Sequence, residues 1–328
     1  MITVRGKRLG LALWGTEPAS VLARHAVLAE AIGFDSVWAI DSQLLCREIT
    51  ITLASILLAT KEIRAATGVT QPVTRHASVM ASAMATLAEL SKGRAIMGIG
   101  TGFSSLRTIG LPPAKIAEVE AFVTTVRDLL RQEDVTFGTT QGRLSWLPAP
   151  CRVPITIAAT GPRMIRTAAR IADGVILHHG VSPDLLGRAL GWLNGAPIEV
   201  SCWTPYSLGA DGTEARDRIR GRVAGALMNA KAEWFEGSER AAVERLQAGY
   251  DVSDHAASAA GHAAIVPDSL VDRYAIAGGP EDVTAQLRRL LDTPGVDRVI
   301  LNPQTVGAGS KSLETVLREF ERDILPAL

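Results

Sequence analysis

The sequence predicts a closed (β/α)8 TIM barrel. Short apolar runs alternate with segments of helical periodicity along the chain, a pattern typical of a parallel sheet covered by helices. Eight such strand-then-helix units fit into 328 residues, which favours a closed barrel over an open doubly wound sheet. One short β excursion, at about 135–147, interrupts the alternation.

The segment 63–102 shows this pattern most completely. A short strand at 63–67 is followed by a turn at Gly68 and by a helix from about Arg75. Apolar residues at 3.6-residue spacing predict that this helix buries one face: Val79, Met80, Ala83, Leu87 and Leu90. A second strand at 95–99 ends in glycines, at the edge where α/β proteins bind ligands.

The other elements follow from the same reasoning. The expected strands are 9–14, 36–40, 63–67, 95–99, 155–159, 174–178, 198–203 and 297–301. The expected helices are 18–31, 49–60, 75–92, 115–131, 163–172, 184–193, 280–291 and 313–324. Residues from about 213 to 274 are polar, Ala-rich and too long for one crossover. We interpret them as a helical insertion within a single domain spanning 1–328.

Composition excludes several classes of protein. Lys+Arg and Asp+Glu both number 34, so no basic excess favours nucleic-acid binding. Charge or glycine interrupts the apolar runs before about 18 residues, which argues against a membrane span. The first ten residues lack the apolar core of a secretory signal, so we expect a cytoplasmic protein. The three cysteines are far apart and show no metal spacing, so we expect reduced thiols and no metal.

Residues after each strand are candidates for a ligand site, because parallel strands of a barrel end at one face. The strongest signal is 160–164, where Thr160 and Gly161 precede a helix that begins at Pro162. Free amides at a helix start bind phosphate, and Arg163 adds positive charge. Gly100 would let a ligand approach the backbone, although glycine at a strand end is also an ordinary turn signal.

Polar side chains at the strand ends could take part in chemistry. Asp41 either directs a carboxylate toward the mouth of the barrel or caps the next helix. His178 and His179 could contact substrate, transfer a proton or bond backbone carbonyls, and no acidic residue lies at metal-ligand spacing from them. Asp41 and His179 are therefore the candidate catalytic residues.

Four segments resemble the luciferase-like flavin and deazaflavin oxidoreductases, in particular the branch that includes the F-420-dependent methylenetetrahydromethanopterin reductases. They are AEAIGFDSVWAID, ATGVTQPVTRHASVMASAMATLAELSKGRAIMGIGTG, ITIAATGPRMIRTAARIADGVIL and AGGPEDVTAQLRRLL. The family fold is a (β/α)8 barrel with insertions, in agreement with the strand count.

The resemblance implies a role for each group of residues. Gly68 and Val69 would form a non-proline cis peptide bulge that supports one face of an isoalloxazine-like ring. Asp41, Thr70, Gly100 and Thr101 would line that ring. The phosphate or phospholactyl tail would be held by Ala159, Thr160, Gly161, Pro162, Arg163 and Met164. The substrate would face Trp14, Ser42, Phe103 and His178.

Two positions depart from the pattern of sugar-phosphate dehydrogenases in this superfamily. Those enzymes carry an acidic residue after their Gly-Thr-Gly and a histidine after the strand-two aspartate, where this chain has Phe103 and Ser42. We therefore do not expect hexose-phosphate oxidation. The methanopterin reductases also have an acidic residue after their glycines, so the resemblance assigns no general acid here.

Three functions are consistent with this reading. The first is an oxidoreductase that transfers a hydride between coenzyme F-420 and a small organic substrate. The second is an FMN-dependent monooxygenase supplied with reduced flavin by a partner flavin reductase. The third is a barrel that binds a phosphorylated ligand or flavin without turnover. The resemblance also implies a homodimer, in which the apolar helices 49–60 and 77–90 could pair.

Overall fold

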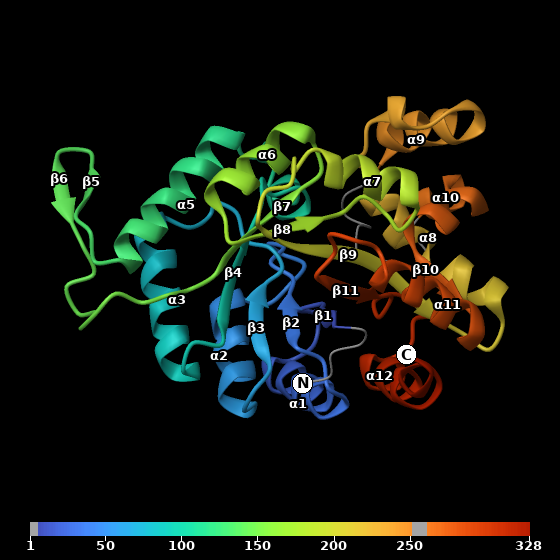
Figure 1. Cartoon of the computed structure of the whole chain (residues 1–328), viewed down its shortest axis with the longest axis horizontal. Coiled ribbons are helices and arrows are strands. Elements are labelled where there is room, and N and C mark those ends of the chain that lie inside the picture. Colours follow the sequence, from blue (N-terminus) through green and yellow to red (C-terminus); the bar gives the residue numbers. More distant parts are fainter. Residues whose placement is uncertain (1–5, 251–260) are drawn as a thin grey trace.

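The computed structural model describes residues 6–250 and 261–328, and its strands close into the expected parallel (β/α)8 barrel (Figure 1). The ring runs β1-β2-β3-β4-β7-β8-β9-β11, and β11 pairs with β1 to close it. The bounds are β1 Arg8–Leu13, β2 Ser36–Ala39, β3 Arg64–Thr67, β4 Ala95–Ile99, β7 Ile155–Ala159, β8 Gly174–Leu177, β9 Glu199–Leu208 and β11 Arg298–Pro303. All eight strands expected from the sequence are present.

Strand β9 is longer than expected, and a short strand that the sequence analysis missed, β10 (Ile276–Gly278), pairs with its far end. Tyr206 of β9 lies opposite both Pro303 and Ile276, so β11 and β10 flank β9 on two sides. Strands β8 and β10 therefore lie on the same side of β9. Strand β8 pairs with the first half of β9, and β10 pairs with the second half.

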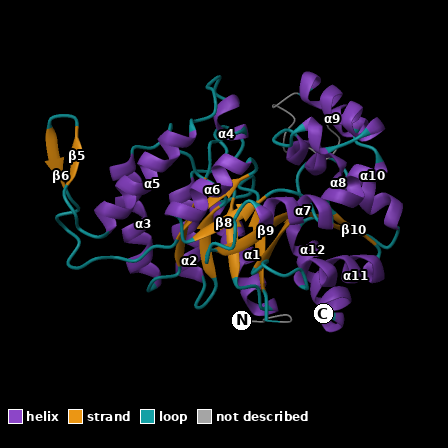
Figure 2. Cartoon of the chain, turned by 45° about the horizontal axis from the view of Figure 1, so that its top comes forward, coloured by secondary structure: helices purple, strands orange, loops and turns teal. Residues whose placement is uncertain are grey.

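Helices surround the ring on its outside (Figure 2). Those between or after the barrel strands are α1 Ala19–Ile32, α2 Ile49–Ala59, α3 Ala77–Ser91, α5 Ile116–Leu130, α6 Pro162–Ile171, α7 Pro183–Gly191, α11 Pro280–Leu291 and α12 Leu313–Glu319. A short helix that was not expected, α4 (Ser104–Arg107), follows β4. The β excursion is an antiparallel hairpin, β5 (Val135–Phe137) and β6 (Thr140–Gly142), which projects away from the barrel in Figure 1.

Between β9 and β10 the described residues form three more α-helices: α8 (Gly212–Leu227), α9 (Gly237–Gly249) and α10 (Asp268–Tyr274). They bury apolar residues in a core of their own, which includes Ile219, Val223, Leu227, Leu246 and Leu270. The segment is therefore less polar on its inner faces than its composition suggested. Residues 251–260 of the expected insertion lie outside the described residues.

The ring has apolar packing on both of its sides. Outward-facing side chains of the strands pack against the helices, as Leu11, Val37 and Val299 do. Inward-facing side chains form a separate cluster inside the barrel: Ala12, Trp14, Trp38, Ile40, Ala66, Ile96, Ile176, Trp203 and Ile300. This alternation follows from the two-residue period of a strand.

The predicted buried face of α3 is partly wrong. Met80 and Leu87 are buried, but Val79 is 60% exposed and Leu90 is 47% exposed. They line a shallow groove between α3 and α2, where Ile51 is 64% exposed. Apolar spacing could not separate the stripe that faces the barrel from a second apolar stripe that faces outward.

No helix within 6–250 and 261–328 is long and apolar enough to cross a membrane. In the same ranges, no group of three or more His, Cys, Asp or Glu side chains could hold a metal ion. The three cysteines are free thiols, with Cys202 buried and Cys46 and Cys151 partly exposed.

A buried charge network joins four strands at the amino end of the barrel. The Arg298 guanidinium donates from Nη2 to Asp35 Oδ2 at 2.9 Å and from Nη1 to the Glu199 carboxylate. Glu199 also accepts from Arg8 Nη2 at 2.7 Å. Burial alone would lower the pKa of Arg298, but the two carboxylates outweigh it and the pKa lies above its ordinary value. The network connects β1, β9 and β11 to the start of β2, where the ring closes.

We expect Arg298→Met to lower the free energy of unfolding by about 3–5 kcal/mol, because it leaves a buried carboxylate without its partner. Urea unfolding followed by circular dichroism measures this change. The matched control is Arg318→Met, which removes an exposed pair with Glu321 and should cost about 1 kcal/mol or less. Equal losses in the two variants would contradict a structural role for the network.

Candidate functional site

The carboxyl ends of the strands surround a cavity of about 550 Å³, which is within the size range of cofactor and small-molecule sites. Its walls come from the ends of β1, β2, β3, β4, β7, β8 and β11, from Trp203 in the middle of β9 and from helix α8. The apolar cluster inside the barrel forms its floor, because Trp14, Ile40, Ile176 and Trp203 belong to both.

A bulge shapes the wall between β3 and β4. The two strands pair at Ala66 and Ile96, but farther along Thr70 lies opposite Ile99, so the β3 side contains one extra residue. The extra length falls at Gly68 and Val69, which both line the cavity. Their peptide bond is cis, as the resemblance implied.

Gly98 and Gly100 make room for this bulge. They lie two residues apart and so share one face of β4. A Cβ there would be 3.1 Å from Val69 Cγ1 at Gly98 and 3.2 Å from Val69 Cγ2 at Gly100. At Gly98 it would also overlap the Thr67 carbonyl oxygen. The Thr67 hydroxyl accepts from the Gly98 N–H at 2.8 Å and donates to its carbonyl at 2.6 Å. A side chain at Gly100 would crowd Val69, so this glycine serves the packing of the bulge as well as the turn.

On another wall the cavity meets the start of α6. Gly161 is the N-cap residue, no side chain caps the helix, and nothing lies within 4 Å of where a Cβ on Gly161 would be. The first-turn amides of a helix have no partner within the helix, so they can bind an anion in this open space. Arg163 and Arg166 are exposed, and neither forms an ion pair within the described part of the chain.

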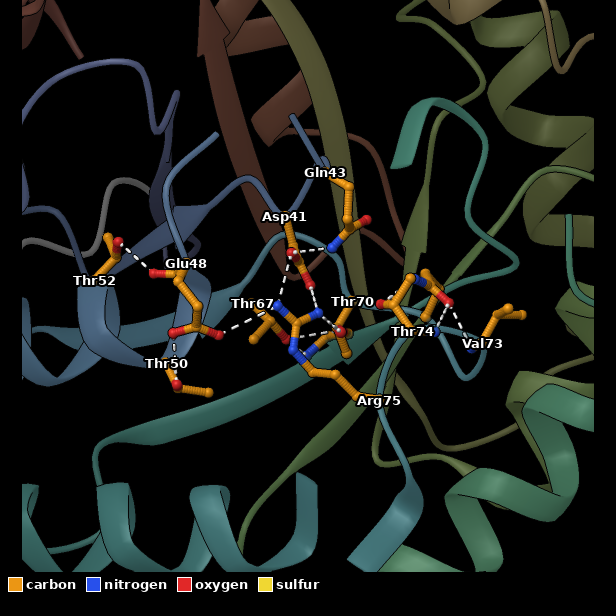
Figure 3. Close-up of polar contacts among 12 residues, drawn as sticks. Asp41, Gln43, Glu48, Thr50, Thr52, Thr67, Thr70, Val73, Thr74 and Arg75 are labelled. Carbon is orange, nitrogen blue, oxygen red and sulfur yellow. Dashed lines mark hydrogen bonds and ion pairs between the residues drawn. The ribbon is translucent and has the colours of Figure 1, made fainter. Parts of the chain in front are cut away.

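Asp41 lines the cavity, but its carboxylate is already paired (Figure 3). Arg75 Nη1 donates to Oδ2 at 2.6 Å, and Gln43 Nε2 donates to Oδ1 at 3.2 Å. Burial raises the pKa of Asp41, and the charge of Arg75 opposes that rise. Helix α2 is capped by Glu48, which accepts from Ile51 N, so Asp41 does not cap it. Asp41 is held in one orientation as a hydrogen-bond acceptor.

The two histidines after β8 have different surroundings. His178 lines the cavity, and burial lowers its pKa to about 4, so its imidazole is neutral at neutral pH. His179 is 1% exposed and outside the lining, with its ring stacked 5.4 Å from Trp234 and edge-on to Trp192 at 5.8 Å. Burial lowers the pKa of His179 to about 4 as well.

The cavity brings together most residues predicted from the sequence: Trp14, Asp41, Ser42, Gly68, Val69, Gly100, Thr101, Phe103, Ala159, Thr160, Gly161, Pro162, Arg163, Met164 and His178. Two predicted residues are not in its lining. Thr70 is fully buried, and its hydroxyl accepts from Arg75 Nη1 at 3.3 Å, so it supports the partner of Asp41. His179 packs among tryptophans, and this placement does not support a catalytic role.

The sequence analysis placed a helical insertion here but did not name the residues by which α8 and the turn after it line the cavity: Arg222, Gly225, Ala226, Asn229 and Lys231. Arginines recur at every second position from 216 to 222. This spacing does not match the 3.6-residue period of a helix, so it does not indicate which arginine faces the barrel. Asn302, near the end of β11, and Trp203, in the middle of β9, also line the cavity, but nothing in their sequence neighbourhood marked them as ligand-binding.

The sequence model of luciferase-like monooxygenases matches residues 6–298. The chain therefore belongs to the luciferase-like monooxygenase family, and it is an oxidoreductase of that family.

Two curated relatives align along nearly the whole chain. The 5,10-methylenetetrahydromethanopterin reductase of Methanolobus tindarius is 26% identical over 326 residues, which cover 95% of this chain and 98% of the relative. The F-420-dependent glucose-6-phosphate dehydrogenase of Amycolatopsis mediterranei is 26% identical over 335 residues and 94% of each chain.

Among solved structures, the coenzyme F-420-dependent tetrahydromethanopterin reductase from Methanopyrus kandleri superposes with a TM-score of 0.75 at 22% identity, covering 98% of this chain and 99% of that one. An F-420-dependent secondary alcohol dehydrogenase with an F-420–acetone adduct gives 0.73 at 18% identity, with 98% of both chains covered. These likenesses show the fold.

We expect Gly98→Ala to lower the free energy of unfolding by about 1–3 kcal/mol, because the new methyl group overlaps the Thr67 backbone and Val69. Gly187→Ala is the matched control. Gly187 lies in α7 with nothing within 4 Å of the added Cβ, so alanine should be neutral or stabilise by up to about 1 kcal/mol. Urea unfolding of both variants checks this, and equal stability would contradict the tight contact at Gly98.

Proposed function

We propose that the protein transfers a hydride between coenzyme F-420 and a small organic substrate. The observation that carries the proposal is that one cavity contains two features. The first is the wall formed by Val69 and Gly100, and the second is the uncapped start of α6 at Gly161. A flat ring needs the first feature and a phosphate-bearing tail needs the second. The F-420-dependent relatives support the choice of cofactor.

The residues present fit such a group. Val69 and Gly100 offer a wall without bulky side chains, and a Cβ on Gly161 would stand in open space where a phosphate can approach the α6 amides. Arg163 and Arg166, exposed and without ion-pair partners among the described residues, would hold the acidic tail. FMN carries a shorter tail and would need fewer of these charges.

When bound, a reduced deazaflavin supplies a hydride with both of its electrons, and the acceptor is reduced as the cofactor is oxidised. The chain's own part is to orient the reactants and exclude water. Asp41, fixed by Arg75, would accept a hydrogen bond from a polar edge of the ring. His178, neutral at neutral pH, carries an imidazole proton that it would share with the substrate.

The substrate side of the cavity departs from that of a sugar-phosphate enzyme. The Ser42 hydroxyl bonds the Ser104 hydroxyl at 2.7 Å, and Phe103 lies 6.1 Å from the Tyr250 ring and 4.7 Å from the Arg107 guanidinium carbon. Ser42 and Phe103 are thus uncharged, whereas the sugar-phosphate dehydrogenases have a histidine and an acidic residue at these two positions. Hexose-phosphate oxidation stays an unexpected activity for this chain.

The double variant Arg163→Glu/Arg166→Glu should weaken F-420 binding by about 10- to 100-fold, because it reverses the charges expected to hold the tail. The effect on FMN should be smaller. Equilibrium fluorescence titration measures both affinities.

A second variant, Gly161→Asp, should abolish F-420 binding, since it places a carboxylate at the helix start. Arg143→Glu, an exposed charge reversal after the β5–β6 hairpin, is the control and should leave both affinities unchanged.

Unchanged F-420 affinity in the Arg163→Glu/Arg166→Glu variant would contradict the tail site. Binding of FMN alone would favour the monooxygenase with its partner flavin reductase, and binding of neither would favour a barrel without redox turnover.

The proposal includes a homodimer in which the groove between α2 and α3 packs against a second copy. Ile51, Leu58, Val79 and Leu90 are exposed apolar side chains on these helices. The cytoplasmic location expected from the sequence stays part of the same proposal.

Val79→Glu combined with Ile51→Glu should convert the dimer to a monomer, because like charges would face each other across the apolar interface. Size-exclusion chromatography with light scattering gives the mass. Leu111→Glu, at an exposed apolar residue outside the groove, should leave the dimer intact. A wild-type mass equal to the 34.8 kDa of one chain would refute the dimer.

A further inference from the structure

Arg222 is a buried cation in the cavity wall that no described residue neutralises. It is 5% exposed, and its Nε, Nη1 and Nη2 atoms have no hydrogen-bond partner among the described residues. The other arginines of α8 pair with carboxylates: Arg216 with Asp272, Arg218 with Glu214 and Arg220 with Asp268. The one arginine of this helix that lines the cavity is thus the one left unpaired.

The guanidinium of Arg222 stacks on the ring of Trp14. The Arg222 Cζ atom lies 3.8 Å from the centre of the Trp14 ring, a stacking arrangement that favours a cation. A ring face does not satisfy the five N–H donors of a guanidinium. Burial lowers the pKa of Arg222 to about 9, so the side chain is still charged at neutral pH. A buried, charged donor set without an acceptor is unfavourable until a ligand supplies one.

Arg222 lies across the barrel from the proposed tail site. Trp14 follows β1, whereas α6 follows β7, and these strands are four places apart in the ring of eight. Two strands so placed stand on opposite sides of a barrel. An anion at Arg222 is therefore a different group from a phosphate held at the start of α6.

The other charges around the cavity leave this position positive. The Asp41 carboxylate is paired with Arg75, and Lys231 is exposed at the rim. Close by, Asn302 accepts from Trp14 Nε1 at 3.2 Å and also lines the cavity. The adjoining floor is apolar, with Ile40 and Trp203.

We propose that Arg222 binds the carboxylate of the substrate, which makes the substrate class a small organic acid with a largely apolar body. The planar guanidinium fork matches a carboxylate with two parallel hydrogen bonds, and the apolar floor accommodates the rest of the molecule. The role of this acid in a reaction rests on the proposed function. The binding itself does not, so the two can fail separately.

The test is isothermal titration calorimetry of the full chain with four acids, butyrate, crotonate, benzoate and cinnamate, each compared with its neutral amide. We expect at least one acid to bind about tenfold or more tightly than its amide, and Arg222→Met to abolish the difference. Arg222→Lys should retain part of it, because it keeps the charge and loses the fork. Arg216→Met is the matched control on the same helix and should keep the full preference.

A second measurement separates a binding role from a structural one. Without ligand, Arg222→Met should raise the thermal unfolding midpoint, because methionine removes an unpaired buried charge. F-420 affinity should stay unchanged in this variant. A lowered midpoint, equal affinity for every acid and its amide, or a preference that survives Arg222→Met would each overturn the proposal. Acid preference without F-420 binding would instead overturn the proposed function alone.

Discussion

The close approach of Gly98 to the end of β3 is the constraint on which the site depends. With no Cβ at Gly98, the Thr67 hydroxyl bonds both backbone groups of that glycine, and the Thr67 carbonyl lies where a side chain would otherwise be. The ladder then resumes one residue out of step at Thr70. The extra residue leaves Val69 against Gly100 in the cavity wall. The absence of a side chain at Gly98 therefore allows Val69 to form this part of the cavity wall.

Three arginines with little exposed surface differ in what neutralises their charge. Arg298 faces two carboxylates at the amino end, and its pKa lies above the ordinary value, as expected of a structural ion pair. Arg75 is mostly buried and fixes Asp41 beside the cavity. Arg222 has an aromatic face and no carboxylate within the described chain, and burial lowers its pKa. Only in the last case does the fold leave a charge for something else to neutralise.

Much of this arrangement could be predicted from the sequence because it follows from local patterns. Apolar runs and helical spacing located all eight barrel strands, and the residues after those strands had to meet at one face. The role of Gly98 and Gly100 in packing Val69 required the pairing of β3 with β4, which no local pattern contains. Val79 and Leu90 were assigned to the core because spacing alone does not say what covers an apolar stripe. Arg222 was missed because its significance lies in the absence of a partner. His179 lies outside the cavity lining although it adjoins His178, because adjacent strand-end residues point in opposite directions.

The central claim is that a deazaflavin ring lies on the Val69 wall with its tail at the start of α6. A crystal structure of the chain with coenzyme F-420 tests this most directly. The account predicts ring density against Val69 and Gly100, and phosphate density at the amides after Gly161. Density for the ligand elsewhere, or a ring placed on the α8 side with its phosphate at Arg222, would contradict the account.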